Sequence, residues 1–266
     1  MSEGLGRVGL LFVGHATVRL DIDGVRVVTD PLLRTALGPL QRHGARPDPA
    51  TLDGASVVLI SHGHPDHLDP WSLRRIPGSP VVVVPRGLGR AVARIARGTV
   101  VELGVGGSVR VAGLEVLAVP ARHWIAPGAP RAQPIGYLVR GTTSVYFAGD
   151  TGRTPRLAAL AGLVDLALLP VWTWGPHLGP GHLGPRAAAE VLRETGASAA
   201  VPIHWGTLYP RRLHHVWDRP LREPGDRFAV HAAAVAPGAD VRVLRPGEET
   251  AFDLVMRPRP RSEAAQ

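Results

Sequence analysis

The sequence predicts an α/β protein in which two mixed β-sheets pack face to face between outer helices, a four-layer αββα sandwich. Two observations predict this fold class. Short apolar runs bounded by turn-forming or polar residues recur along most of the 266 residues, as expected for buried strands. These runs come in bunches, with helix-like segments between some of them. Hydrophobic residues make up 45% of the chain and charged residues 20%, which is ordinary for a soluble globular protein.

The first strands are expected to form a hairpin. Strand-like residues cover 8–12, 17–22 and 25–29, and Asp23-Gly24 supplies a turn between the last two. Residues 31–50 are rich in proline, glycine and arginine, and we expect them to form a loop. Further strands are predicted at 57–60, 81–84, 99–102, 108–111, 114–119, 135–139, 144–148, 166–169, 199–203 and 241–244.

The clearest helix predicted is Pro185 to Thr195, where Ala188, Val191 and Leu192 share one face and Gly196 ends the helix. Shorter helices are predicted at 71–76, 88–96 and 227–236. We expect a single domain over residues 1–255. The arginine- and proline-rich tail, 256–266, is expected to be disordered.

Charge and cysteine content limit the kinds of partner. The formal net charge is +8, and every basic residue is arginine. An anionic partner such as nucleic acid would account for this charge, but so would a coding bias toward arginine, glycine, alanine and proline, which we favour. Cysteine is absent, so disulfides and thiolate metal ligands are excluded. The lack of cysteine also fits a reducing compartment such as the cytoplasm.

No membrane-spanning or export segment is expected. Met1 to Arg7 lacks the basic-then-apolar pattern of a signal peptide. The longest nearly apolar run, 163–174, contains Asp165 and Pro170 and is too short to cross a bilayer. We therefore expect a cytoplasmic protein.

The most informative segment places three histidines and two aspartates within eight residues, directly after the strand predicted at 57–60. They are His62, His64, Asp66, His67 and Asp69. Neutral imidazole nitrogens and carboxylate oxygens are ligands that zinc and similar divalent ions accept. A solvated polar turn is the alternative, but this residue combination after a buried strand favours a metal site. The pattern indicates two metals, and a two-metal site indicates hydrolysis.

Other histidines and aspartates also follow apolar runs. Ligands bind at the carboxyl ends of strands in open α/β sheets, so these side chains are expected to converge on one edge. Taken singly, each would more often be a hydrogen-bonded polar group. They are His15, His123, Asp150 and His204.

Along the chain the candidate ligands follow the order H-x-H-x-D-H, His123, Gly149-Asp150-Thr151 and His204. This order resembles that of the metallo-β-lactamase superfamily, over roughly residues 8–208. The closest likeness is to the branch of N-acyl-phosphatidylethanolamine phospholipase D and the ascorbate-phosphate lactonases. The segments that carry it are Gly14-His15-Ala16-Thr17, Thr29-Asp30-Pro31, Arg122-His123-Trp124, Phe147-Ala148-Gly149-Asp150-Thr151-Gly152, Gly181-His182 and His204-Trp205-Gly206-Thr207.

This resemblance implies two divalent ions, zinc by preference and manganese as the other candidate. The first would be held by His62, His64 and His123, and the second by Asp66, His67 and His204. Asp150 would bridge the two ions together with a water or hydroxide. The catalytic residues implied are Asp66, Asp150 and His182; His182 would donate a proton or bind an oxyanion.

Neighbouring polar residues are expected to support the ligands. His15, Asp30 and Asp69 are candidates for orienting them, with an ordinary loop hydrogen bond as the alternative for each. Four tryptophans could line a pocket mouth or pack in the core, and the core is the more common place. They are Trp124, Trp172, Trp174 and Trp205.

The chain departs from some relatives of this kind. It has no cysteine ligand, which argues against β-lactam hydrolysis by the enzymes that use one. It also lacks a long N-terminal extension and an apolar membrane-facing segment, which argues against a membrane-lipid substrate. The segments 31–50 and 125–134 are expected to be variable loops that shape specificity.

The sequence therefore predicts a metal-dependent hydrolase with a metal-bridged hydroxide that attacks a phosphodiester or a lactone or other ester. An arginine at the pocket would favour the phosphodiester, and Arg122, Arg131 and Arg153 are the candidates. The alternative is a non-catalytic metal-binding sensor or nucleic-acid-associated protein of the same fold, of which the nucleic-acid partner is not favoured. The oligomeric state stays open.

Overall fold

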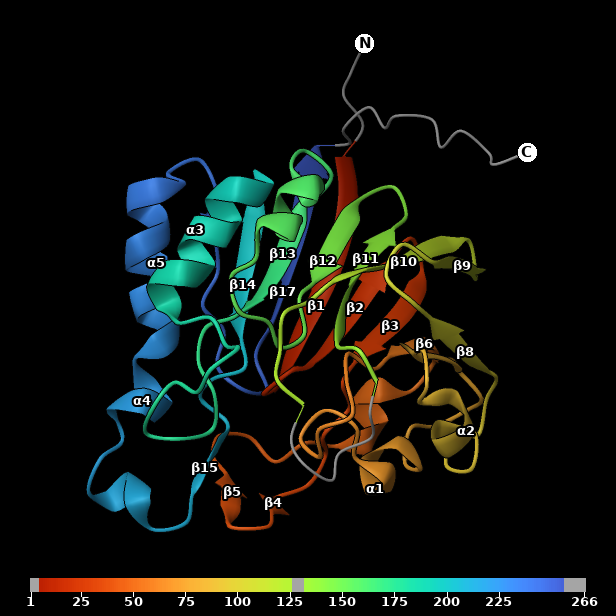
Figure 1. Cartoon of the computed structure of the whole chain (residues 1–266), viewed down its shortest axis with the longest axis horizontal. Coiled ribbons are helices and arrows are strands. Elements are labelled where there is room, and N and C mark those ends of the chain that lie inside the picture. Colours follow the sequence, from red (N-terminus) through yellow and green to blue (C-terminus); the bar gives the residue numbers. More distant parts are fainter. Residues whose placement is uncertain (1–4, 126–131, 256–266) are drawn as a thin grey trace.

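The computed structural model describes residues 5–125 and 132–255. The tail predicted at 256–266 and Arg131 lie outside the described residues. The described chain contains two seven-stranded sheets and a small three-stranded sheet (Figure 1). Helices flank the two large sheets, so the predicted αββα class is confirmed.

The first large sheet is mixed. Its strands pair antiparallel from β17 to β3 and parallel from β3 to β8. In spatial order they are β17 (Glu249–Val255), β1 (Leu5–Gly14), β2 (Thr17–Ile22), β3 (Val25–Thr29), β6 (Ala55–Leu59), β7 (Val81–Pro85) and β8 (Val100–Leu103). Strand β7 lies between two parallel neighbours, which explains why it reads as an unbroken valine run.

The second large sheet mirrors this arrangement. Its strands pair parallel from β16 to β12 and antiparallel from β12 to β9. In spatial order they are β16 (Asp240–Val241), β14 (Ala199–Ile203), β13 (Leu166–Pro170), β12 (Ser144–Phe147), β11 (Ile135–Arg140), β10 (Leu114–Pro120) and β9 (Ser108–Val111).

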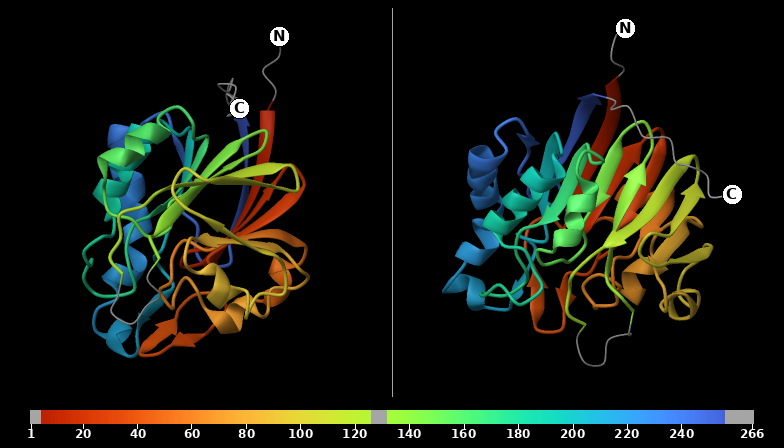
Figure 2. Two further views of the ribbon diagram at one scale, coloured as in Figure 1. Left: turned by 45° about the vertical axis from the view of Figure 1, so that its right-hand side comes forward. Right: turned by 45° about the horizontal axis from the view of Figure 1, so that its top comes forward.

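Apolar side chains from both sheets meet in the central core, which includes Phe12, Tyr137 and Phe147. A second cluster lies between the first sheet and the single-turn helices α1 (Pro70–Leu73) and α2 (Gly89–Val92). A third cluster lies between the second sheet and the longer helices. These helices flank that sheet (Figure 2). They are α3 (Pro185–Thr195) and α5 (Pro224–Val235), the latter preceded by α4 (Arg219–Arg222).

Helix α3 has the predicted bounds. Pro185 occupies its first turn, where a missing N–H costs nothing. Gly196 ends it in a left-handed conformation with φ 65°, and its N–H donates to the carbonyl of Leu192. The described residues also form three short 3-10 helices: η1 (Pro49–Leu52), η2 (Pro155–Leu160) and η3 (Leu213–His215).

The segment 31–50 is predicted to be a loop, but the structure shows that it also contains a short hairpin. Strands β4 (Ala36–Leu37) and β5 (Leu40–Arg42) pair across a two-residue turn in which Gly38 has φ 54°. Strand β15 (Leu208–Pro210) pairs with β5 and completes the small sheet. Strands this short show no alternation of apolar residues, so the sequence pattern does not reveal them.

The last strand was also predicted in the wrong place. Only residues 240–241 of that region form a strand, and the chain ends its described part in β17, which pairs along β1. Strand β17 lies at a sheet edge, and its exposed Glu249 and Asp253 weaken its apolar signal. The helices predicted at 71–76 and 88–96 are reduced to α1 and α2.

Among the residues that the structure describes, no helix is long and apolar enough to cross a membrane.

Candidate metal centre

The predicted site residues follow the carboxyl ends of strands from both large sheets. The first sheet contributes residues after β1, β3 and β6, and the second contributes residues after β10, β12 and β14. The structure brings all of the predicted ligands together at this edge. They are His62, His64, Asp66, His67, His123, Asp150 and His204.

The turn after β6 is held by main-chain hydrogen bonds. The N–H groups of His67 and Leu68 both donate to the carbonyl of His64, at 3.0 and 2.8 Å. Two residues later, Asp69 caps helix α1 by accepting from the N–H of Ser72 at 3.0 Å. This compact turn presents Asp66 and His67 on a backbone that is fixed at both ends.

His67 and His204 face each other through their Nε2 atoms, 3.1 Å apart. The Nδ1 of His67 lies 2.7 Å from Oδ2 of Asp30, and the Nδ1 of His204 lies 3.0 Å from the carbonyl of Trp172. Carboxylate and carbonyl oxygens only accept, so we assign the proton of each neutral ring to Nδ1. The two Nε2 lone pairs then point at each other, and a cation or an extra proton between them is needed to remove the repulsion.

The histidines expected to hold the first ion also face one another through ring nitrogens. His123 donates from Nδ1 to the carbonyl of Gly181 at 3.0 Å. Nδ1 of His62 lies 2.9 Å from Oγ of Ser61, which itself donates to a carboxylate and can therefore accept. The Nε2 atoms of His62 and His123 lie 2.9 and 3.1 Å from Nδ1 of His64. Three ring nitrogens thus converge on one point.

Asp150 lies between the two groups of histidines. Its Oδ2 is 3.3 Å from Nε2 of His67 and 3.7 Å from Nε2 of His123. Its Oδ1 is buried and makes no hydrogen bond, although Nε2 of His204 is only 3.1 Å away. A buried carboxylate oxygen without a donor is costly unless a cation neutralises it. The residues present therefore fit a pair of divalent ions.

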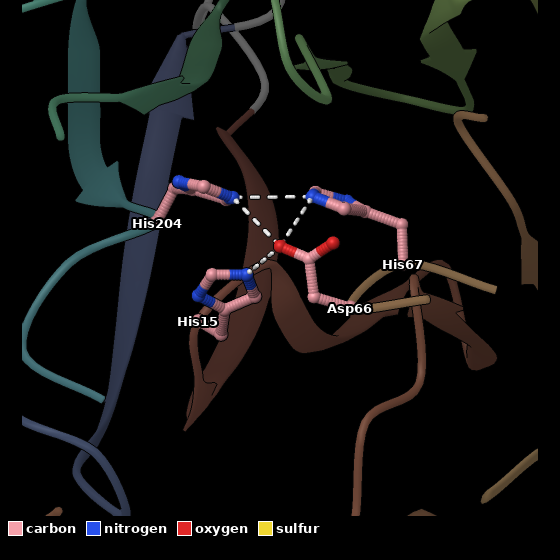
Figure 3. Close-up of side chains that lie close together, drawn as sticks. All are labelled: His15, Asp66, His67 and His204. Carbon is pink, nitrogen blue, oxygen red and sulfur yellow. Dashed lines mark hydrogen bonds and ion pairs between the residues drawn. The ribbon is translucent and has the colours of Figure 1, made fainter. Parts of the chain in front are cut away.

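Among the groups whose possible ligand atoms lie within 4.8 Å of one another, two contain the residues expected to hold the two ions. His62, His64 and His123 make one group. The other contains Asp66, His67 and His204, and His15 joins it (Figure 3). The roles of these residues as ligands stay predictions.

Burial and mutual charge set the protonation of the site. Burial lowers the pKa of His62 and of His204 well below the usual value, which keeps both rings neutral. Burial would raise the pKa of Asp66 and Asp150, but the neighbouring imidazoles outweigh it and hold both pKa values below the usual range. Burial opposes a charge on His67, yet Asp150, Asp66 and Asp30 raise its pKa well above the usual value. The same carboxylate field would attract a metal cation.

The expected supporting residues differ in their roles. Asp30 orients His67 and also accepts from the N–H and Oγ of Ser61, at 2.7 and 2.5 Å. His15 contacts a carboxylate, with its Nε2 2.9 Å from Oδ2 of Asp66. Asp69 takes the alternative role, a local hydrogen bond: it caps α1, and both of its carboxylate oxygens lie 2.9 Å from Nε of Arg34.

A pocket of about 570 Å³ opens over the ligands. His182 lines it, with Nε2 3.2 Å from Oδ2 of Asp150, and His177 lies at its wall. Of the four tryptophans, Trp124 and Trp174 line this pocket. The other two do not: Trp205 is fully buried in the core, and Trp172 packs against the α3 and α5 side of the second sheet.

None of the arginines proposed for the pocket lines it in the described part of the chain. Arg122 donates to the carbonyl of Arg153 at 3.3 Å, and Arg153 pairs with Glu190 and Glu194 of α3. Their sequence neighbours are site residues, but their side chains extend along the surface.

Two residues near the site were not anticipated. Ser61 links Asp30 to His62, and its only sequence signal is its position directly before the histidine cluster. Arg42 is buried and donates to the carbonyls of Val13, Leu32 and Arg34, which lie in the segments around His15 and Asp30. No sequence signal distinguishes Arg42 from the many surface arginines.

Comparison with known proteins identifies the family. The family model described as "Beta-lactamase superfamily domain" matches residues 25–205. An uncharacterized protein of Mycobacterium tuberculosis is 31% identical over 261 residues, which cover 91% of this chain and 68% of that protein. A UPF0173 metal-dependent hydrolase of Methanopyrus kandleri is 30% identical over 256 residues, which cover 90% of this chain and 97% of that protein.

Solved structures share the fold. Igni18, a metallo hydrolase from Ignicoccus hospitalis, has a TM-score of 0.70 at 23% identity, covering 92% of this chain and 98% of its own. CmlA, a diiron beta-hydroxylase from Streptomyces venezuelae, has a TM-score of 0.69 at 22% identity, covering 96% and 55%. These likenesses concern the fold, which hosts more than one chemistry. On the sequence matches, the chain belongs to the metallo-β-lactamase superfamily and, within it, to the UPF0173 metal-dependent hydrolase family.

Proposed function

We propose that this protein is a dinuclear metal-dependent hydrolase that cleaves a phosphodiester or a lactone or other ester. The observation that carries the proposal is the position of Asp150. One of its oxygens faces His67 and His123, and the other is buried near His204 without a hydrogen-bond donor. A carboxylate in this position suits a bridge between two cations.

The residues divide into two ligand sets with Asp150 shared between them. His62, His64 and His123 would hold one ion, and Asp66, His67 and His204 the other. When bound, two such ions would lower the pKa of a shared water and polarise the bond under attack. The nitrogen and oxygen donor set favours zinc, with manganese as the alternative.

The chain's own contribution to the chemistry would come from His182. Its Nδ1 lies 3.3 Å from the carbonyl of Gly179, and its Nε2 lies 3.2 Å from Asp150 at the pocket. Partial burial opposes a charge on this ring, but Asp150 raises its pKa above the usual value. His182 is therefore suited to hold a proton at Nε2 and to donate it to the leaving group.

The test combines metal analysis with hydrolysis assays on bis(4-nitrophenyl) phosphate and a simple lactone, with and without added zinc or manganese. We expect turnover of at least one substrate that depends on metal and is lost in His64→Ala and Asp150→Ala. His182→Ala should keep both ions but lose about 100-fold or more in kcat, within the range of general acid catalysis. Metal binding without turnover on a broad substrate panel would contradict the proposal.

That contrary outcome would favour the alternative, a metal-binding sensor of the same fold. Salt-dependent binding of DNA or RNA would then indicate its nucleic-acid version, for which the +8 charge is the only support. The likeness to the phospholipase and lactonase branch, the single domain over 1–255 and the cytoplasmic location also stay predictions.

A further inference from the structure

The pocket over the candidate metal centre has two chemically different parts. Its base carries the imidazoles and carboxylates of the site, including Asp150 and His182. Its walls are largely apolar and include Pro65, Trp124 and Trp174. A volume of about 570 Å³ falls within the range of small-molecule sites in proteins.

The wall tryptophans leave much of their surface in water. Trp124 is 56% exposed and Trp174 is 42% exposed, whereas Trp205 is 1% exposed. Large aromatic side chains gain free energy when they are covered, and these two sit where a bound substrate would cover them. The pocket therefore favours a substrate with an apolar or aromatic group next to the bond that is cleaved.

The described lining offers no arginine to an anionic substrate. Recognition of a phosphodiester usually involves a guanidinium or ammonium group beside the metals. Of the arginines expected at the pocket, the two that the structure describes bond elsewhere: Arg122 donates to a main-chain carbonyl, and Arg153 pairs with two glutamates of α3. The ions and imidazoles would supply positive charge only at the base of the pocket, so a charged group farther from the bond under attack would lie against the apolar walls.

We infer that the substrate is a neutral ester or lactone that carries an apolar or aromatic group, not an anionic phosphodiester. This inference rests on the proposed hydrolase function and narrows it to one substrate class. The apolar group would lie between Trp124 and Trp174, with the carbonyl directed toward Asp150 and His182. Water would add to the carbonyl carbon, the bond to the leaving oxygen would break, and that oxygen would take up a proton.

The test uses the zinc-loaded full chain and substrates that share one leaving group. 4-Nitrophenyl butyrate is neutral, mono-4-nitrophenyl succinate adds an anionic carboxylate to an acyl chain of similar length, and bis(4-nitrophenyl) phosphate is an anionic diester. We expect kcat/KM for the butyrate to exceed that for the succinate by about 100-fold or more, because the carboxylate must lose its hydration in an apolar site. Comparable values, or preferred cleavage of the phosphodiester, would overturn the inference.

A set of tryptophan variants tests the wall. Trp174→Ala should raise KM for the butyrate about tenfold with kcat nearly unchanged, since it removes a contact made equally in the ground and transition states. Trp174→Phe should stay within about twofold of the parent, because it keeps an aromatic face. Trp217→Ala is the matched control, since Trp217 is also 42% exposed but does not line this pocket. Equal KM changes for Trp174→Ala and Trp217→Ala would contradict the assignment.

Failure of this inference differs from failure of the proposed function. If the phosphodiester is cleaved and the neutral ester is not, the protein remains a hydrolase and only the substrate class is wrong. If no substrate is turned over while two zinc ions are bound, both the hydrolase proposal and the substrate inference are wrong.

Discussion

His15 and His204 are joined by their main chains: the N–H of His204 donates to the carbonyl of His15 at 2.7 Å. Both residues have left-handed backbones, with φ of 59° and 62°. Such a conformation costs a non-glycine residue about 1–2 kcal/mol, so the surrounding structure must hold it in place. His15 follows β1 of the first sheet and His204 follows β14 of the second. This hydrogen bond therefore joins the two sheets at the candidate metal centre.

His15 is expected to support the second ion through Asp66. Its Nε2 lies 2.9 Å from Oδ2 of Asp66, and its ring centroid is 3.9 Å from that of His204. We predict that His15→Ala weakens binding of one zinc ion about 10- to 100-fold and leaves the other ion in place, because supporting contacts of metal ligands contribute on this scale. Calorimetric zinc titration would measure this, with the exposed His215→Ala as control. Unchanged zinc affinity in His15→Ala would show that His15 does not support zinc binding.

Asp30 is expected to act on the same ion through His67. The Asp30→Asn substitution keeps an oxygen that can accept from Nδ1 of His67 but removes the negative charge. We predict a loss of about tenfold in zinc affinity, with a larger loss in Asp30→Ala, which leaves both Nδ1 of His67 and the N–H of Ser61 without this partner. If Asp30→Asn and Asp30→Ala bind zinc as the parent does, the contact is structural only.

Zinc uptake is expected to release protons in a way that identifies His67. In the metal-free protein the carboxylates raise its pKa well above the usual value, although burial opposes this, so the ring carries an extra proton at pH 7. His62 and His204 are neutral there because burial lowers their pKa. A ligand must lose its proton to bind a metal, so we predict release of about one proton from the protein's own side chains.

A weakly buffered indicator assay at pH 7 measures this release. Water bound to the ions could add its own proton, so the informative quantity is the difference from the His67→Gln variant, which should release about one proton fewer. Because its pKa is raised on folding, the charged His67 stabilises the metal-free fold. This contribution is complete at pH values below the pKa of His67 in the unfolded chain, near 6.5, and is lost as pH rises through the pKa in the folded protein. Equal release by both proteins would show that His67 is already neutral.

Arg42 is expected to stabilise the segments on which the site is built. It is buried, and its guanidinium donates to the main-chain carbonyls of Val13, Leu32 and Arg34. Burial lowers its pKa to about 10, so it remains charged at neutral pH. We predict that Arg42→Met lowers the free energy of unfolding of the metal-free protein by about 3 kcal/mol, since it leaves buried carbonyls without donors. Urea denaturation measures the change, and the exposed Arg90→Met should stay within about 0.5 kcal/mol of the parent.

The buried strands were predictable because their apolar runs are nearly continuous. The run at 81–84 became β7, and the run at 199–203 became β14 with the same bounds. The short strands β4 and β5 and the edge strand β17 were missed. Their signals are weak because two or three residues show no period, and because an edge strand carries charges on its exposed face.

The candidate site was predictable in composition but not in its contacts. The candidate ligand residues and their order can be read from the sequence. Their side chains converge because parallel strands end at one edge of a sheet. The contact of His15 with Asp66 depends on how the strand ends meet in space. Likewise, Trp172 and Trp174 are two residues apart, yet only Trp174 lines the pocket. No sequence period separates these two positions.

The most direct test of the account is the number of zinc ions per chain, measured by elemental analysis of the purified, zinc-equilibrated protein. The two groups of candidate ligands predict two ions in the parent and about one in His64→Ala, with the second group intact. A single ion in the parent, or two ions retained in His64→Ala, would contradict the claim that Asp150 lies between a pair of cations.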